Sequence, residues 1–284
     1  MRNFTFKGLL LTAVFMLLGC LSIQAANDDL ITKQITIKLD KAGTLPDRIA
    51  SSKKYKITNL KIVGEINGTD WNMIREMAGR NYQESSTEGN LSVLDLSEAK
   101  IVAGGDYYYD DNLFNNKVYT SNDEIGEYAF AYCSGLTSLT LPVGITSIGE
   151  FAFSGCSGLT SLTLPAGITS ISEFAFSYCS GLTSIYVYAE KVPRIGRYAF
   201  EGCASRKCTL YVPKGTYDNY RLSEFGYFEN IVEFDATGID KTTTSTDVEE
   251  VSRYSLNGQR LVGPTKGLNI VKYSDGSVKK VAVE

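Results

Sequence analysis

The sequence has 284 residues, of which 43% are hydrophobic and 21% charged, so it is long enough to bury a core. Its 28 basic and 32 acidic residues, with a pI of about 5.2, give no basic surface for nucleic acid. Histidine is absent, which excludes histidine-dependent nucleophiles, histidine metal sites and histidine pH switches. Carboxylate-pair catalysis stays open in principle, but it requires a cleft that places two acids together.

The first residues are typical of an export signal. Arg2 and Lys7 precede an apolar run over residues 8–21, and small residues follow as far as Ala26. The run is shorter than a bilayer span, which argues against a permanent membrane helix. Residues 1–26 are therefore predicted to be a signal peptide, and the chain is expected to be exported, to the cell surface or the medium, with the periplasm as the alternative.

Two processing routes fit this segment. Ile23-Gln24-Ala25 matches an ordinary signal-peptidase site, which is the route we favour. Leu17-Leu18-Gly19-Cys20 is similar to a lipobox, in which Cys20 would carry a lipid, although Leu18 is bulky for that motif. Lipidation at Cys20 is the open alternative, and it is the only membrane attachment that we expect.

Residues 27–124 are predicted to form an irregular N-terminal cap. Alternating apolar residues at 35–39 indicate a first strand, and Pro46 suits a helical first turn over residues 45–50. A longer helix is expected over residues 70–78, with Thr69 or Asp70 as N-cap and Gly79 as the stop. The spacing L-x-x-L-x-L appears at residues 57–62 and 91–96, which indicates two irregular coils.

Residues 125–234 carry an internal repeat. Ile125, Ile148, Ile171 and Ile195 lie 23, 23 and 24 residues apart, and each opens a block of the type I-G-E-[FY]-A-F-x-x-C-S-G-L-T-S-L-T-L-P. A fixed period of this length predicts a solenoid. Each block keeps the L-x-x-L-x-L spacing, which predicts a short strand with apolar residues inside and polar residues outside: Leu136, Leu139, Leu141; Leu159, Leu162, Leu164; Leu182, Ile185, Val187.

Between these strands, apolar residues recur at offsets of three and four. This pattern, seen in Ile148, Phe151, Ala152 and Cys156, predicts one or two helical turns that face the same core. Stacking the blocks at about 4.8 Å joins their backbone ladders and aligns identical side chains. We therefore expect an α/β repeat solenoid with short strands on its concave face.

The last block degrades into a C-terminal cap. Lys207 stands where a strand leucine is expected, a longer helix is predicted over residues 214–228, and a strand follows at 231–234. Residues 235–250 are polar and are predicted to be a linker. Residues 251–284 are predicted to form a small all-β tail, with a hairpin turn at Asn257-Gly258 and a second hairpin that pairs 268–273 with 278–283.

The phrase A-F-x-x-C-S-G-L-T-S-L-T-L-P closely resembles the BspA-like, or Treponema pallidum type, leucine-rich repeats of exported Bacteroidetes proteins. The resemblance is strong over residues 125–213 and weaker upstream to Ile57. It implies a surface or secreted binding protein, because family members resemble adhesins. The tail is similar to C-terminal segments of exported Bacteroidetes proteins, including sorting domains, but a simple β cap fits it equally well.

Four cysteines recur with the blocks, at Cys133, Cys156, Cys179 and Cys203. Equivalent positions of a solenoid form a line, whereas zinc needs four ligands around one point, so we expect a buried row and no metal or other cofactor. Pairing of Cys203 with Cys208 is left open by the sequence.

Two candidate binding sites follow from the pattern. The first is the outward side of the strands, which is expected to form the concave face; its predicted ligand-binding residues are Thr137, Thr140, Thr160, Thr163, Thr183, Tyr186 and Tyr211. The alternative interpretation is that these threonines have no role in binding and are present because threonine favours strands. The second is a loop that interrupts the repeat and carries Tyr107, Tyr108 and Tyr109 between aspartates, where rings and hydroxyls could contact protein or sugar.

No nucleotide, hydrolase or zinc motif is present in the sequence, so we do not expect an enzyme. The sequence predicts noncovalent binding, with adhesion to a host or bacterial protein through the concave face as the first choice. A glycan-binding surface protein and a structural envelope protein without a specific ligand are the alternatives.

Overall fold

The computed structural model describes residues 29–111 and 116–236, together with the backbone of the tail strands at 250–255, 260–261, 267–273 and 278–283. The expected signal peptide, Cys20, the main part of the linker and the Asn257-Gly258 turn lie outside the described residues. Among the helices that are described, none is long and apolar enough to cross a membrane.

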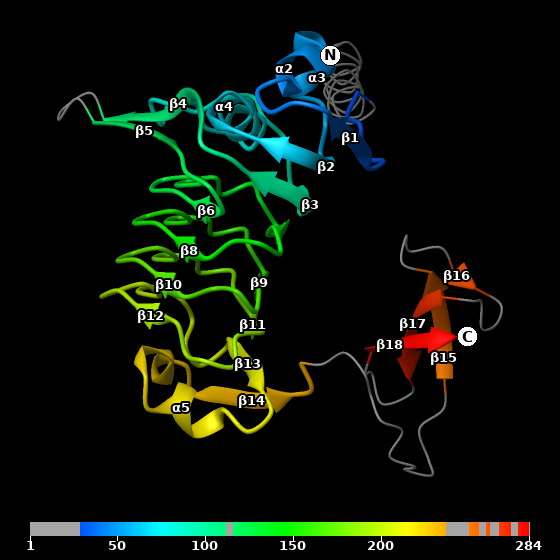
Figure 1. Cartoon of the computed structure of the whole chain (residues 1–284), viewed down its shortest axis with the longest axis vertical. Helices are drawn as coiled ribbons and strands as arrows, with labels where there is room; N and C mark the ends of the chain where they lie inside the picture. Colours follow the sequence, from blue (N-terminus) through cyan, green and yellow to red (C-terminus); the bar gives the residue numbers. More distant parts are fainter. Residues whose placement is uncertain are drawn as a thin grey trace, which may run out of the picture.

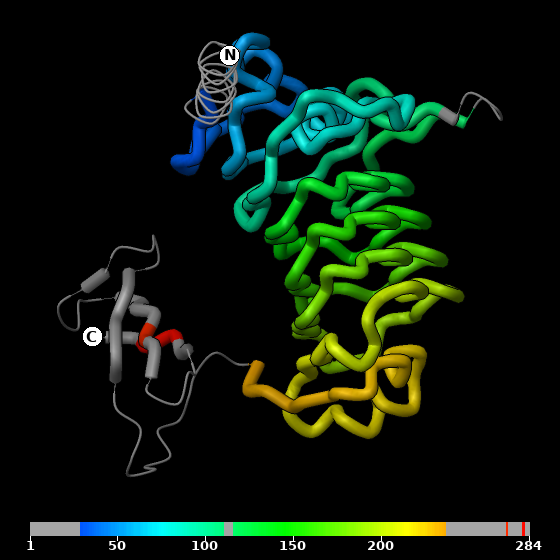
Figure 2. Tube along the Cα trace, turned by 180° about the vertical axis from the view of Figure 1, so that it is seen from behind, coloured from blue at the N-terminus to red at the C-terminus, as the bar shows by residue number. Residues whose placement is uncertain are grey.

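A sheet of eight parallel strands runs the whole length of the solenoid (Figure 1). In spatial order the strands are β1 (Ile35–Leu39), β2 (Asn59–Ile66), β3 (Val93–Ile101), β7 (Ser138–Thr140), β9 (Ser161–Leu164), β11 (Ser184–Val187), β13 (Thr209–Pro213) and β14 (Asn230–Phe234). The predicted inward residues are buried; Leu159, Leu162 and Leu164, for example, are at most 1% exposed. The predicted repeat solenoid is therefore confirmed, and Figure 2 shows its stacked coils from behind.

A second parallel sheet, which the sequence did not predict, lies on the opposite side of the coils. Its strands are β6 (Glu124–Ile125), β8 (Ser147–Ile148), β10 (Ser170–Ile171) and β12 (Arg194–Ile195), in the order β12-β10-β8-β6. Each strand ends at the isoleucine on which the repeat aligns. The aligned isoleucine is therefore a strand residue, paired in register with its copies in the neighbouring coils.

The predicted helical turns after these strands are wrong, because residues 126–137, 149–160 and 172–183 form turns and irregular segments and no helix. In each coil, the residue that follows the third position of the I-G-E motif has a positive φ. This angle is 52° at Phe151 and 54° at Phe174, in the left-handed region that a right-handed α-helix cannot use. The backbone N–H groups of this residue and of the residues two and four positions later donate to carbonyls of the next coil. Phe151, Phe153 and Gly155 donate to the carbonyls of Glu173, Ala175 and Ser177 at 3.3, 2.7 and 2.8 Å.

In the interior, the same two contacts recur from coil to coil: stacked phenylalanine rings and hydrogen bonds from cysteine thiols to backbone carbonyls. Phe130, Phe153, Phe176 and Phe200 stack in a column with centroids 4.9 to 5.4 Å apart. The thiols of Cys156, Cys179 and Cys203 donate to phenylalanine carbonyls of the preceding coil at 3.1 to 3.2 Å. The identical phrases of the sequence thus place identical groups in contact, which fixes the register of the coils.

The N-terminal cap is built on helix α4 (Gly68–Met77). Its N-cap is Asn67, two residues before Thr69 and three before Asp70, the two predicted N-caps, and Asp70 instead completes a capping box. The buried Asp70 carboxylate also accepts the N–H groups of Gly43 and Leu45 at 2.6 and 2.8 Å. It thereby fastens the short helix α2 (Leu45–Arg48) to α4, and Lys54 of α3 (Ser51–Lys54) forms an ion pair with Glu76 of α4.

Side chains of this cap close the first end of the backbone ladder. The carbonyls of Glu127 and Ala129 have no preceding coil to bond with, and they accept the Tyr108 hydroxyl at 2.9 Å and the Trp71 indole N–H at 3.1 Å. The buried Arg75 guanidinium donates to the carbonyl of Tyr128. Tyr108 and Trp71 thus supply two of the donors that a preceding coil would otherwise provide.

The C-terminal cap differs from the prediction. In place of one longer helix, α5 (Tyr217–Arg221) is followed by a 3-10 turn, η1 (Glu224–Tyr227), and then by β14. Phe225 and Phe228 pack on Phe200 and close the interior column. The leucine missing at Lys207 is replaced by the fully buried Cys208, one residue later.

The tail strands form an antiparallel sheet in the order β16-β15-β17-β18, with bounds Arg260–Leu261, Glu250–Ser255, Gly267–Tyr273 and Val278–Val283. Leu268 pairs with Ala282, and Tyr254 pairs with Arg260. The predicted pairing of 268–273 with 278–283 is confirmed.

The cap's closure of the ladder can be tested with Tyr108→Phe. This change removes only the hydroxyl that donates to the carbonyl of Glu127, and the Tyr108 side chain is itself buried, so we expect the free energy of unfolding to fall by about 1–2 kcal/mol. Urea unfolding followed by circular dichroism measures the change. Tyr217→Phe, on the exposed surface, should stay within about 0.5 kcal/mol of the parent; equal stability of both variants would contradict the assignment.

Candidate functional site

The long sheet brings the predicted concave residues to one face. Thr137, Thr160 and Thr183 are exposed and form one column, and Thr140 and Thr163 form a second column that continues into Tyr186 and Tyr211. The hydroxyls of Thr160 and Thr183 donate to the carbonyls of Thr137 and Thr160 at 3.2 and 3.1 Å, so these hydroxyl protons are used within the solenoid. The first column therefore offers methyl groups and oxygen lone pairs to a ligand.

An aromatic platform, formed by Tyr186, Tyr188, Tyr211 and Phe234, occupies the C-terminal end of this face. Tyr186 and Tyr211 stack with centroids 4.4 Å apart and planes 6° apart, and Phe234 contacts Tyr186 and Tyr188 edge-on. Burial raises the pKa of Tyr186, and the neighbouring Tyr211 adds to the shift. The Tyr186 hydroxyl is therefore a protonated hydrogen-bond donor at neutral pH.

Tyr188 and Phe234 were missed as site residues. Tyr188 follows Tyr186 at the two-residue spacing of a strand, and it is 37% exposed. Phe234 lies in the strand that the sequence predicted, but only the stacking of β14 beside β13 brings it to the platform.

The Tyr107–Tyr109 segment is not the exposed loop that was expected. It belongs to β4 (Gly104–Asp111), which pairs with β5 (Asn116–Thr120) as a hairpin. Tyr108 is 1% exposed and donates to the first coil, and Tyr109 is 7% exposed and stacks on Tyr128 at 4.1 Å. Both side chains are needed to close the ladder and the aromatic column, so they are unavailable to a ligand on the surface.

Tyr107 is the member of the trio that reaches the surface, where it is half-buried. It contacts Tyr82 and Tyr119 edge-on, with centroids 5.4 and 6.2 Å apart, and the Lys117 ammonium lies 4.4 Å from its ring centre. This small cluster is the remainder of the predicted loop site.

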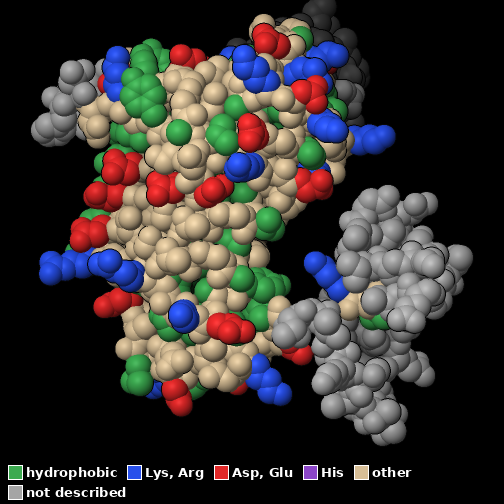
Figure 3. All heavy atoms as spheres, viewed as in Figure 1, with side chains coloured by type: hydrophobic (Ala, Val, Ile, Leu, Met, Phe, Trp, Pro, Cys, Tyr) green, Lys and Arg blue, Asp and Glu red, His purple; other side chains and the backbone are tan. Residues whose placement is uncertain are grey.

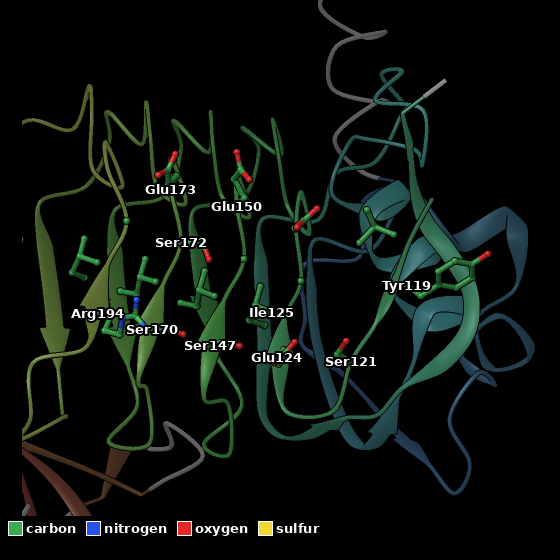
Figure 4. Close-up of a pocket in the computed structure, with 18 of the residues that line it drawn as sticks. Tyr119, Ser121, Glu124, Ile125, Ser147, Glu150, Ser170, Ser172, Glu173 and Arg194 are labelled. Carbon is green, nitrogen blue, oxygen red and sulfur yellow. The ribbon is translucent and has the colours of Figure 1, made fainter. Parts of the chain in front are cut away.

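A groove of about 830 Å³ follows the second sheet, on the side of the coils opposite to the platform's sheet. Figure 4 shows Glu150 and Glu173 projecting in the same direction along one rim, with Tyr119 at the hairpin end. In Figure 3, acidic side chains gather along the edge that carries these coils. Glu127 continues the rim in the preceding coil.

Repetition of the acid in I-G-E places like charges beside one another. Burial raises the pKa of Glu150, and the neighbouring carboxylates of Glu127 and Glu173 raise it further. In the fourth block the acid is replaced by Arg197, which ends the row. The sequence contained this signal, since the same position of three blocks is Glu, but it was not recognised as a surface feature.

The cysteines form the predicted buried row. Cys133, Cys156, Cys179 and Cys203 are at most 5% exposed, and these four together with Cys208 are free thiols. Burial raises the pKa of Cys133 to about 11 and that of Cys208 to about 12. Within the described residues, no group of His, Cys, Asp or Glu is arranged to hold a metal ion.

The repeats identify the class of protein. The family described as the BspA type leucine-rich repeat region matches residues 103–225 in six copies, so this part of the chain consists of leucine-rich repeats of the BspA type. Repeats of this type suggest a protein-interaction or surface role.

Among solved structures, a leucine-rich repeat protein from Bacteroides ovatus is similar at 21% identity and a TM-score of 0.33, over 72% of this chain and 42% of that one. The chain thus spans less than half the length of that protein. Among curated protein sequences, none is significantly similar to the chain.

The buried thiols predict low reactivity. With a pKa of about 11, Cys133 would have about one thiolate in a thousand molecules at pH 8 even with free access to reagent. We expect a chain starting at residue 27 to show less than one reactive thiol with Ellman's reagent when folded, and five in concentrated guanidinium. Rapid labelling of the folded chain would contradict a closed row.

Proposed function

We propose that this protein binds a partner protein through the outward face of the long sheet, with the aromatic platform as the principal contact. The main support for this proposal is the platform itself. Its four rings pack on one another at the end of the two threonine columns: Tyr186, Tyr188, Tyr211 and Phe234. Packed rings are already ordered, so binding through them loses little side-chain entropy. Tyrosine supplies both apolar area and a hydroxyl, the combination enriched at protein interfaces.

The geometry favours protein over glycan as the partner. Sugars stack on open aromatic faces, whereas one face of the Tyr186 ring and one face of the Tyr211 ring are covered by each other, with centroids 4.4 Å apart. Hydrophobic side chains also gather over this end of the long sheet (Figure 3), where Val232 is 45% exposed next to the platform's strands. A protein surface can use ring edges, hydroxyls and aliphatic groups together.

The double variant Tyr186→Ala with Tyr211→Ala tests the site. For a partner captured by the parent chain and then purified, we expect the dissociation constant to rise at least 30-fold, as for the loss of a central aromatic pair. Surface plasmon resonance with the immobilised partner measures it, and the same two proteins are applied to immobilised glycans.

The matched control is Tyr119→Ala with Tyr178→Ala, which removes two tyrosines that are 50% and 60% exposed away from the platform. The control should bind like the parent, and both variants should keep the circular dichroism spectrum of the fold. Equal binding by the platform variant would refute this surface, and selective glycan binding that the platform variant loses would favour the glycan alternative.

We also propose export, supported by the leader-like residues 1–26 and by the family's surface roles. Protease digestion of the solenoid on intact cells, with the mass of the mature N-terminus measured in the same sample, tests this proposal. A terminus near Ala26 or an acylated Cys20 is expected. Protection until the outer membrane is broken would place the protein in the periplasm and would rule out adhesion between cells.

A further inference from the structure

The backbone ladder that joins the coils has an open second end. In each earlier step, three N–H groups on alternate residues donate to three carbonyls of the next coil. For the last step these pairs are Phe174 to Arg197, Phe176 to Ala199 and Tyr178 to Glu201, at 3.1, 2.7 and 2.6 Å. The equivalent donors of the last coil are the N–H groups of Tyr198, Phe200 and Gly202, and none of the three has an acceptor within the described part of the chain.

An acceptor is open at the same edge. The carbonyls of Ile125, Ile148 and Ile171 each accept an N–H from the next coil, at 2.7 to 2.9 Å. The carbonyl of Ile195 has no such donor among the described residues, because β12 is the edge strand of its sheet. One acceptor followed by three alternate donors is the hydrogen-bonding pattern that a further parallel segment would complete.

The edge is accessible through a cleft between the last coil and η1. The cleft holds about 210 Å³, and its lining includes Ile195, Tyr198 and Phe200, which carry open backbone groups, and Glu201, Glu224 and Tyr227. This volume is the share of roughly seven water molecules, so the open N–H groups can be hydrated in the free protein. A peptide backbone can exchange those waters for its own carbonyls.

We propose that residues 195–202 are a docking site for an extended, basic peptide segment of a partner protein, which adds to the solenoid in the place of one more coil. Main-chain pairing of this kind recognises backbone first and side chains second. The residue that accepts the middle bond is Ala152, Ala175 or Ala199 in the successive coils, all at most 2% exposed. The middle residue of the peptide must therefore be small.

The charge of the cleft favours basic residues on both sides of the small middle residue of the peptide. The two charged residues that line the cleft, Glu201 and Glu224, are both acidic and exposed. Arg197 is on the same coil but does not line the cleft. Lysine or arginine on either side of the small residue would complement the two carboxylates.

A second copy of this chain does not fit the site. Its first coil would have to offer the carbonyls of Glu127 and Ala129, which already accept the Tyr108 hydroxyl and the Trp71 indole. The N-terminal cap thus blocks end-to-end stacking of copies. This site is also separate from the aromatic platform and does not depend on the function proposed for it.

The test uses amide exchange by NMR on the 15N-labelled chain, with the acetylated and amidated peptide Ile-Gly-Lys-Thr-Ala-Thr-Lys as the probe. In the free protein, the amides of Tyr198, Phe200 and Gly202 should exchange at least tenfold faster than those of Phe174, Phe176 and Tyr178. Saturation with the peptide should slow the first three at least tenfold. A peptide with tryptophan in place of alanine should bind at least tenfold more weakly.

Charge reversal gives an independent readout. Glu201→Lys with Glu224→Lys should weaken peptide binding at least tenfold, whereas Glu190→Lys, exposed and outside the cleft, should leave it unchanged. Three results would overturn the proposal: amides 198, 200 and 202 already protected in the free protein, no binding at millimolar peptide, or peptide-induced shifts confined to Tyr186 and Tyr211.

Discussion

Alternate backbone N–H groups in each coil find their acceptors only in the next coil, and the rest of the solenoid depends on this hydrogen bonding. The left-handed residues, such as Phe151 and Phe174, prevent a helix that would satisfy those groups locally. A buried N–H without a partner costs roughly 1–3 kcal/mol, so a coil is stable only beside a neighbour in the right register. The repeated phenylalanine and cysteine positions supply that register, because each phenylalanine ring packs on its own copy and cysteine thiols donate to phenylalanine carbonyls of the preceding coil.

This dependence makes the two ends of the solenoid chemically different. At one end the carbonyls of Glu127 and Ala129 are left over, and the cap covers them with donors from Tyr108 and Trp71. At the other end N–H groups have no acceptor among the described residues, and the apolar rings of Phe225 and Phe228 close the interior without supplying acceptors to the outer edge. A surface for main-chain recognition therefore arises where the cap protects the core but leaves the edge open.

Much of this arrangement could be predicted from the sequence, because the strand of each block has a strict two-residue alternation and the period is nearly constant. The second sheet could not, since two-residue strands such as Ser147–Ile148 have no periodicity of their own and exist only through pairing with copies. The spacing of Ile148, Phe151 and Ala152 looked helical because it records burial on one side, which a left-handed turn produces as well. Tyr108 was misplaced for a related reason: a tyrosine beside aspartates looks exposed until the ladder's unpaired carbonyl at Glu127 is known.

The candidate surface was predicted only in part, because strand alternation identifies outward residues but not which of them cluster. Thr140 and Tyr211 were assigned correctly to the outward side, whereas Phe234 reaches the platform through a neighbour relation between strands that sequence order does not reveal.

The coils also have a consequence for how the length of such a protein can vary. Because each interior coil presents the same donors to one neighbour and the same acceptors to the other, a unit such as residues 148–170 is interchangeable with its neighbours. Gain or loss of a whole unit would leave both caps matched to the coils they cover, whereas gain or loss of a few residues would misalign every column beyond that point. The length of this fold can therefore change only in steps of whole units. Duplication of single units is a route by which related chains can acquire longer binding faces without a change to either cap.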